Sequence, residues 1–230
     1  GALSIGLMFG LLILVLATIT FVVFIERAQR RLLVQYPKRQ VGNKMFGGDN
    51  SHLPLKLNTS GVIPAIFASS LLLMPITIAN FSSGQGPDWV NSITTLLGRG
   101  QPLYMIIYAS LIVFFCYFYT AIVFNPEDTA DNLKKQGGFI PGIRPGERTA
   151  QYIDFVLTRL TVVGSIYLVL VCLLPEFLIS RFAVPFYFGG TSVLIIVNVA
   201  MDTMTQFQGY LFAHQYEGLL KKSKLGSRKR

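Results

Sequence analysis

The chain has few charged residues and almost no cysteine. Only 13% of its 230 residues are Asp, Glu, Lys or Arg, whereas 52% are hydrophobic. Soluble globular domains carry about 25% charged residues, so this composition argues against a soluble protein and favours a membrane protein. The two cysteines, Cys116 and Cys172, each lie inside a long apolar run. Their positions argue against a disulfide framework and predict that both residues serve in packing.

Motifs of enzyme chemistry are also missing. The chain contains no phosphate-binding Gly-Lys-Ser/Thr loop, and its two histidines, His52 and His214, lie far apart in the sequence. The few acids and hydroxyls within the apolar runs form no recognisable catalytic pair. We therefore expect no enzymatic activity, no cofactor and no metal.

Long apolar runs dominate what is present. Five of them occupy residues 3–24, 59–80, 103–124, 155–175 and 184–204. Each has roughly 20 residues, and at about 1.5 Å per residue such a helix covers a hydrocarbon core of about 30 Å. The runs are continuous rather than alternating, which favours helices over strands. We predict an all-α membrane protein with five transmembrane helices.

Basic residues predict the orientation of these helices. Seven lie in the first loop (25–58), four in the second (125–153) and six in the tail (205–230), whereas the opposite side carries only Arg99 and Arg181. Loops rich in Lys and Arg face the cytoplasm, so the C-terminus is expected inside and Gly1 outside. This distribution also disfavours nucleic-acid binding as the reason for the net charge of +9. Because the chain starts on an apolar helix without an insertion signal, we expect it to be one half of a larger protein.

Both loops carry turn signals. In the first, strand-like residues 31–36 and 52–57 flank the Gly-Gly-Asp-Asn sequence at 47–50, which predicts a hairpin that projects from the membrane. Its positive charge serves either to anchor topology or to dock an acidic or RNA-bearing partner. In the second, Pro126 suits the start of a helix and Gly137 its end, and residues 141–146 form a turn-rich tip that presents Arg144.

The second apolar run is rich in small and hydroxyl residues and contains Pro64 and Pro75. Small residues permit close helix packing, and prolines allow bending. Two interpretations follow: a tightly packed bundle helix, or a helix that moves against a neighbour and borders an aqueous path.

Four strings of residues together resemble one known family. They are Gly61-Val-Ile-Pro-Ala-Ile-Phe-Ala68, Thr129-Ala-Asp-Asn-Leu-Lys-Lys135, Gly137-Gly-Phe-Ile-Pro-Gly-Ile-Arg-Pro-Gly-Glu147 and Val184-Pro-Phe-Tyr-Phe-Gly-Gly-Thr-Ser192. In this order they resemble the C-terminal half of the bacterial SecY family, over essentially the whole chain. The five runs correspond to the sixth through tenth helices of that family.

The resemblance implies a protein-conducting channel of the bacterial inner membrane, which passes unfolded polypeptides across the membrane or releases them sideways into lipid. The implied pore ring contains Ile66 and Ile195, and a narrow ring of aliphatic side chains excludes ions by dewetting. The implied lateral gate includes the following residues of the second run: Gly61, Pro64, Ala65, Phe67, Ser69 and Ser70. The implied docking residues for the ribosome and the SecA motor are Lys38, Arg39, Lys44, Lys134, Lys135, Arg144 and Arg148.

The same resemblance implies a set of partners. They are the SecE and SecG subunits, the SecA ATPase, the ribosome, the N-terminal half of the same protein, signal peptides and nascent chains, and the lipid bilayer. Asn43 stands in the first loop where the family resemblance leads us to expect a basic residue.

Two other classes of function compete with the channel. A secondary transporter of small solutes shares Pro/Gly-broken helices but normally needs ionisable groups near the midplane. Asp154, Arg159, Glu176 and Asp202 all lie near the ends of the predicted spans. A purely structural scaffold is the other alternative, and it would conduct nothing when completed.

Overall fold

The computed structural model describes residues 4–81, 86–98, 100–182 and 190–227. The helices are α1 (Ile5–Arg27), α2 (Ile63–Phe81), α3 (Asp88–Leu96), α4 (Pro102–Val123), α5 (Pro126–Lys135), α6 (Glu147–Phe182) and α7 (Gly190–Ser227). The strands are β1 (Gln29–Gln35), β2 (Arg39–Val41), β3 (Lys44–Phe46) and β4 (Asn50–Lys56). All four strands lie between α1 and α2, so the rest of the described chain is helical or irregular.

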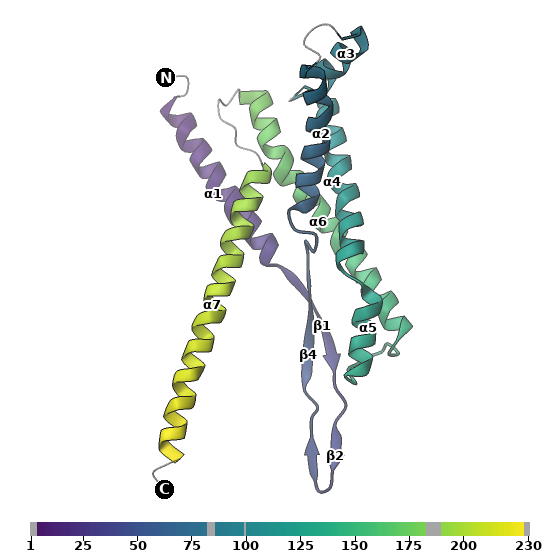
Figure 1. Cartoon of the computed structure of the whole chain (residues 1–230), viewed down its shortest axis with the longest axis vertical. Helices are drawn as coiled ribbons and strands as arrows, with labels where there is room; N and C mark the ends of the chain where they lie inside the picture. The colour runs from purple at the N-terminus through teal and green to yellow at the C-terminus, as the bar shows by residue number, and fades with distance from the viewer. Residues whose placement is uncertain (1–3, 82–85, 99, 183–189, 228–230) are drawn as a thin grey trace.

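Membrane-spanning helices make up most of the fold. Among the described residues, four segments are long and apolar enough to cross a membrane: Ile5–Arg27, Ile63–Phe81, Pro102–Lys135 and Glu147–Leu178. The predicted class, an all-α membrane protein, is confirmed. The fifth predicted run, 184–204, begins among residues outside the described ranges. Its described part continues into the predicted tail as the single helix α7, part of which projects from the bundle (Figure 1).

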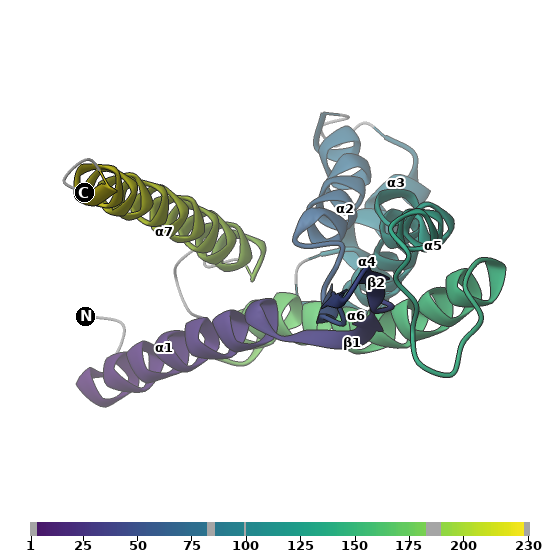
Figure 2. The ribbon, with the colours of Figure 1, turned by 90° about the horizontal axis from the view of Figure 1, so that it is seen from below.

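A buried core holds the bundle together. Side chains from α1, α2, α4, α6 and the first turns of α7 meet in it, including Val22, Ala65, Ile112, Leu168 and Leu194. Figures 1 and 2 show α2 and α4 side by side, with α6 next to them. Small residues of α2 are fully buried here, because a small side chain lets two helix backbones approach closely. The other faces of these helices expose large apolar side chains, as lipid-facing surfaces do.

The first loop forms the predicted hairpin, but its turn lies elsewhere. Strand β1 pairs antiparallel with β4, and further out β2 pairs with β3. Val41 pairs with Lys44, so Gly42 and Asn43 form the two-residue tip, with Gly42 at φ +66°. A two-residue turn of this kind needs positive φ, which glycine and asparagine tolerate.

The prediction of a turn at residues 47–50 was therefore wrong. Gly47 and Gly48 have φ values of +93° and +97° and lie on the returning side of the hairpin, between the β2–β3 ladder and the longer β1–β4 ladder. Their freedom at positive φ interrupts the strand rather than reversing the chain. A glycine at positive φ is compatible both with a chain reversal and with an interruption of a strand. Only the pairing of the flanking residues shows which of the two occurs here.

Candidate functional site

The hairpin is attached to the second loop at one end of the molecule. The Gln35 N–H donates to the Phe139 carbonyl at 2.8 Å, and the Phe139 N–H donates back to the Gln35 carbonyl at 2.9 Å. This pair forms an isolated antiparallel bridge between β1 and the segment that follows α5. We name this end of the molecule the basic end: it comprises the hairpin (29–56), α5 and residues 136–153.

A second apolar cluster packs the parts of the basic end against one another. Leu32, Val34 and Leu55 of the hairpin meet Leu133 of α5. Ile140, Ile153, Val156 and Leu160, from the loop after α5 and from α6, complete this cluster. Most of these side chains are almost fully buried, so the two loops form one packed body rather than two independent projections.

Helix α5 has the predicted start and end. The Asn125 side chain accepts a hydrogen bond from the Glu127 N–H at 3.1 Å, which caps the first turn. Gly137, at φ +76°, follows the last turn and lets the chain reverse, and the Gly138 N–H donates to the Leu133 carbonyl at 2.9 Å. The helix therefore presents Lys134 and Lys135 at its exposed C-terminal turn, close to the bridge.

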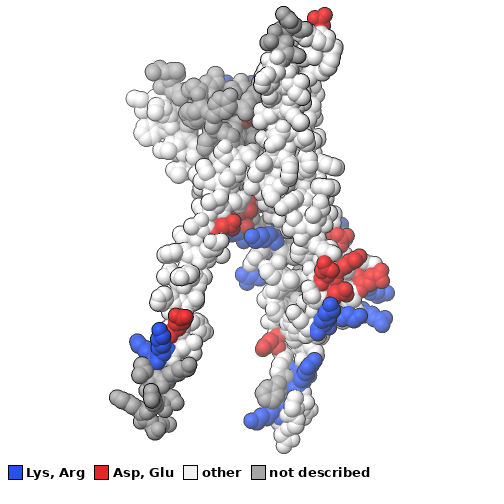
Figure 3. All heavy atoms as spheres, in the orientation of Figure 1, with Lys and Arg blue, Asp and Glu red and all other residues white. Residues whose placement is uncertain are grey.

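The predicted docking residues all lie at the basic end. All seven side chains are exposed: Lys38, Arg39, Lys44, Lys134, Lys135, Arg144 and Arg148. The Thr149 hydroxyl donates to the Arg144 carbonyl at 3.0 Å, which ties the arginine-bearing tip to the first turns of α6. Figure 3 shows Lys and Arg gathered over this end of the molecule. Their docking role stays a prediction.

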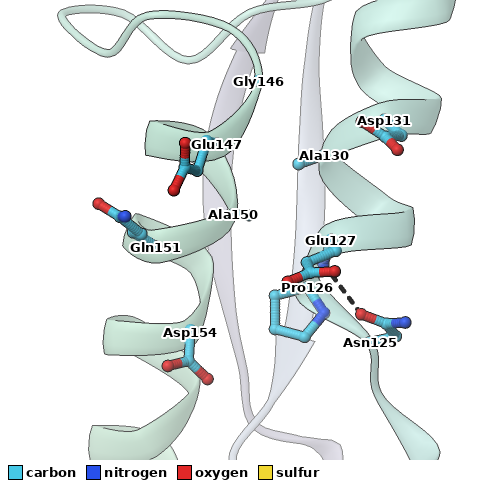
Figure 4. A pocket seen from close by; sticks show the side chains of 10 residues that line it. All are labelled: Asn125, Pro126, Glu127, Ala130, Asp131, Gly146, Glu147, Ala150, Gln151 and Asp154. Atoms are coloured by element: carbon cyan, nitrogen blue, oxygen red, sulfur yellow. Dashed lines mark hydrogen bonds between the residues drawn. The ribbon is translucent and has the colours of Figure 1, made fainter.

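An acidic cavity lies beside these basic residues. It measures about 580 Å³ and is lined by residues of α5 and of the start of α6 (Figure 4). Four carboxylates line it, Glu127 and Asp131 from α5 and Glu147 and Asp154 from α6. The surface of the basic end is therefore mixed in charge, and Figure 3 shows acidic side chains next to the basic ones. Among the residues that the structure describes, no group of three or more His, Cys, Asp or Glu side chains could hold a metal ion.

The predicted gate residues lie on different faces of α2 and at its start. Pro64 and Ala65 are buried in the bundle, whereas Phe67 is half exposed and stacks on Phe115 of α4, with ring centroids 5.6 Å apart. Ser70 is exposed and its hydroxyl donates to the Ile66 carbonyl at 2.9 Å, while Ser69 is half-buried. Gly61 precedes the helix at φ +68°. The buried small residues of α2 allow close packing against the bundle. The exposed face of α2 is free to contact another protein surface or lipid.

The two predicted pore residues lie on separate helices. Ile66 of α2 is 37% exposed and Ile195 of α7 is 39% exposed. The two helices stand apart in both views of the ribbon (Figures 1 and 2). Neither side chain is buried inside this chain, and the pore ring stays a prediction.

A buried polar network was missed by the sequence reasoning. Glu26, in the last turn of α1, is only 8% exposed. Its Oε1 accepts hydrogen bonds from Asn58 Nδ2 at 3.0 Å and from the Tyr167 hydroxyl of α6 at 3.1 Å. Ser60 Oγ donates to Asn58 Oδ1 at 3.1 Å. We name Glu26, Asn58, Ser60 and Tyr167 the junction network.

The sequence contains a weak signal for this network. Glu26 is a carboxylate at the end of an apolar helix, a place usually interpreted as the membrane interface. The polar run Asn58-Thr59-Ser60 lies 32 residues later, where the chain re-enters the bundle. An acid followed by polar groups at the two ends of a hairpin suggests a shared buried site, but the tyrosine on a distant helix gives no such signal.

The fold is that of a multi-pass α-helical membrane protein with one large hairpin between two of its helices. The family model described as SecY matches residues 2–204. The chain therefore belongs to the SecY family, as its sequence motifs indicated.

Curated relatives agree with this assignment. The chain is 57% identical to the protein translocase subunit SecY of Rickettsia conorii, over 98% of this chain and 52% of that protein. It is 58% identical to the protein translocase subunit SecY of Escherichia coli, over 93% of this chain and 48% of that protein. The chain thus spans about half the length of the curated relatives it matches.

A solved structure shares the fold. It is described in terms of the plug domain of the SecY protein and the closed state of the translocation channel. The two chains superpose with a TM-score of 0.54 at 18% identity, over 85% of this chain and 48% of that one. At this identity the likeness supports the fold alone.

Proposed function

We propose that this chain supplies one half of a protein-conducting channel, through which unfolded polypeptides cross a bacterial inner membrane or enter it sideways. The observation that carries the proposal is the family match over residues 2–204 of a chain that has helices long and apolar enough to span a membrane. The matched SecY relatives are named protein translocase subunits, and this chain spans about half of each. The remaining half, together with SecE and SecG, would complete the pore.

The basic end would face the cytoplasm. The excess of Lys and Arg there supports this orientation, because basic loops are retained on the cytoplasmic side. The packed arrangement of hairpin, α5 and α6 supports a docking role, since a partner meets one stable surface rather than two mobile loops. We assign the seven exposed basic residues to contacts with the ribosome and with the SecA motor.

Helix α2 would form part of the lateral gate, and Ile66 and Ile195 part of the pore ring. The exposed face of α2 supports the first assignment, because a gate helix needs one face free to separate from the other half. The partial exposure of the two isoleucines supports the second assignment, because a side chain that lines a pore between two halves must not be buried inside its own half. Signal peptides and nascent chains would pass along these surfaces.

The proposal is tested by a chimaera in which this chain replaces the matching half of the Escherichia coli relative. We expect the chimaera to support growth and secretion in cells depleted of their own SecY. A stable, membrane-inserted chimaera that secretes nothing would overturn the proposal.

Ile195→Asn in the same chimaera tests the pore assignment. A polar amide hydrates the constriction, so we expect ion conductance of the reconstituted resting channel to rise several-fold. Ile196→Asn is the matched control, because Ile196 is adjacent and more exposed, at 67%. Equal conductance in the two variants would remove Ile195 from the pore ring.

A further inference from the structure

The junction network lies where three helices and both ends of the hairpin meet. Glu26 lies in the last turn of α1, shortly before β1 begins, and Asn58 follows β4 just before the turn that leads to α2. The Leu57 N–H donates to the Ala28 carbonyl at 3.2 Å and closes the base of the hairpin. The chain that leads from the hairpin to α2 is therefore the short segment 57–62.

Asn58 holds that segment in two directions at once. Its Nδ2 donates to Glu26 Oε1 at 3.0 Å and to the Gly61 carbonyl at 3.1 Å. The first bond connects the segment to α1, and the second fixes the turn directly before α2. Gly61 has φ +68°, a backbone conformation that glycine adopts without steric cost, and this conformation places its carbonyl within reach of Asn58.

The α6 helix completes the junction through its closest approach to the segment. Tyr167 donates to the same Glu26 oxygen at 3.1 Å, and its ring lies 5.9 Å from that of Phe21. One turn earlier, a Cβ on Gly164 would lie 2.6 Å from the Leu57 carbonyl oxygen. The α6 backbone thus passes directly against the segment that Asn58 anchors.

The network is buried, which makes it stiff. Glu26, Asn58, Ser60 and Tyr167 are each at most 8% exposed. Inside a protein, hydrogen bonds to a carboxylate are strong, and a buried group that loses its partner finds no water to replace it. Movement of the hairpin base must then either carry the start of α2 with it or break several buried bonds together.

We propose that Glu26 is a positioning residue that couples the hairpin to α2, with Asn58 and Tyr167 as its two donors. A partner docked on the hairpin shifts its base, and the network transmits this shift to the N-terminal turn of α2. The docking partner in this scheme rests on the proposed function, but the mechanical coupling does not.

The coupling is tested by distances within the complete chimaeric channel. Spin labels on His52→Cys of the hairpin and Thr77→Cys of α2, both exposed positions, report their separation by pulsed electron resonance. The native cysteines, Cys116 and Cys172, are buried and do not compete for label. We expect Tyr167→Phe to broaden the distribution of distances between the two labels, and Asn58→Ala to broaden it further. In Asn58→Ala, the fraction of molecules whose hairpin base has separated from α2 should increase about tenfold.

Thr161→Val is the matched control for Tyr167→Phe. Thr161 is also a buried hydroxyl of α6, but it donates to the Leu157 carbonyl of its own helix at 2.8 Å. Loss of this hydroxyl should leave the distribution of distances between the two labels narrow. Identical distributions in Tyr167→Phe and Thr161→Val would overturn the proposal.

A functional readout separates coupling from docking. In Tyr167→Phe we expect purified SecA and non-translating ribosomes to bind within about twofold of the unaltered chimaera, while SecA-driven transport falls about tenfold. If SecA-driven transport in Tyr167→Phe falls by the same factor as SecA binding, the loss is explained by docking alone and the coupling is contradicted. If the unaltered chimaera does not transport at all, the proposed function fails, and the distance measurement still decides the coupling.

Discussion

At the scale of single residues, glycine decides how closely α6 approaches the hairpin base. Gly164 is helical and has ordinary backbone angles, so its lack of a side chain matters through space and not through conformation. The backbone oxygen of Leu57 occupies the place that a Cβ would need. Backbone atoms cannot move aside as a flexible side chain can, so a larger residue must push two elements apart.

Gly164→Ala is therefore expected to destabilise the protein by roughly 1–3 kcal/mol, because overpacking forces backbone shifts. The measurement is the thermal unfolding midpoint of the purified chimaera. Gly209→Ala in α7 is the control, because a Cβ there meets nothing within 4 Å. Alanine favours helix at such a site, so the control should be neutral or slightly stabilising. Equal midpoints for the two variants would contradict the close approach.

A second residue-scale prediction concerns the arginine at the tip of the second loop. Arg144→Glu should reduce SecA-driven transport at least about tenfold, since reversal of a docking charge replaces attraction with repulsion. The assay is secretion of a reporter into vesicles that contain the chimaera. Arg181→Glu is the matched reversal at the other end of α6, and it should leave the rate unchanged. Normal secretion with Arg144→Glu would refute the docking role.

At the scale of elements, the two loops of the basic end act as one body. The backbone bridge between Gln35 and Phe139 and the shared apolar cluster join segments that are about a hundred residues apart. Gly138 makes this approach possible. A Cβ at this position would lie 3.0 Å from the Tyr36 ring and 3.1 Å from a Val34 methyl group.

Gly138→Leu should separate the hairpin from the second loop. A Cβ here is already in tight contact with two β1 side chains, so the bulk of leucine should push the loop away and open the two bridging hydrogen bonds more often. Hydrogen exchange at the Gln35 and Phe139 amides measures this opening, and we expect it to speed up about tenfold or more. Gln136→Leu, at an exposed neighbouring position, should leave both rates unchanged. Protected amides in Gly138→Leu would show that the bridge does not depend on this glycine.

At the scale of the whole molecule, charge and apolar surface are segregated. The bundle exposes large apolar side chains on most of its outer faces, whereas the basic end collects exposed Lys and Arg. This division matches a protein whose middle contacts lipid and whose basic end contacts water. The exposed Trp89 of α3 lies at the opposite end, where α3 is seen in Figure 1.

Orientation is tested by labelling single introduced cysteines in intact cells. Met45→Cys at the basic end should react with a membrane-impermeant maleimide only after permeabilisation, because basic loops stay inside. Trp89→Cys should react from outside. Both positions are exposed, at 73% and 64%, so accessibility depends on the side of the membrane and not on burial. The reverse pattern would invert the proposed topology.

The sequence by itself determined the class of protein, the presence of the hairpin and the start and end of α5. These features depend on run length, on alternation and on turn residues close together in the chain, all of which are local. The position of the hairpin turn was missed, because glycines at 42 and at 47–48 both permit positive φ and only strand pairing selected the first.

Only the tertiary structure decided which distant residues meet. It packed the two loops into one body, placed the predicted gate residues on different faces of α2, and buried Glu26 against a tyrosine 141 residues away. Such contacts follow from how helices pack, and local propensity carries no information about them. A carboxylate that the sequence places at a membrane surface thus becomes the centre of a buried junction, because the fold brings its donors to it.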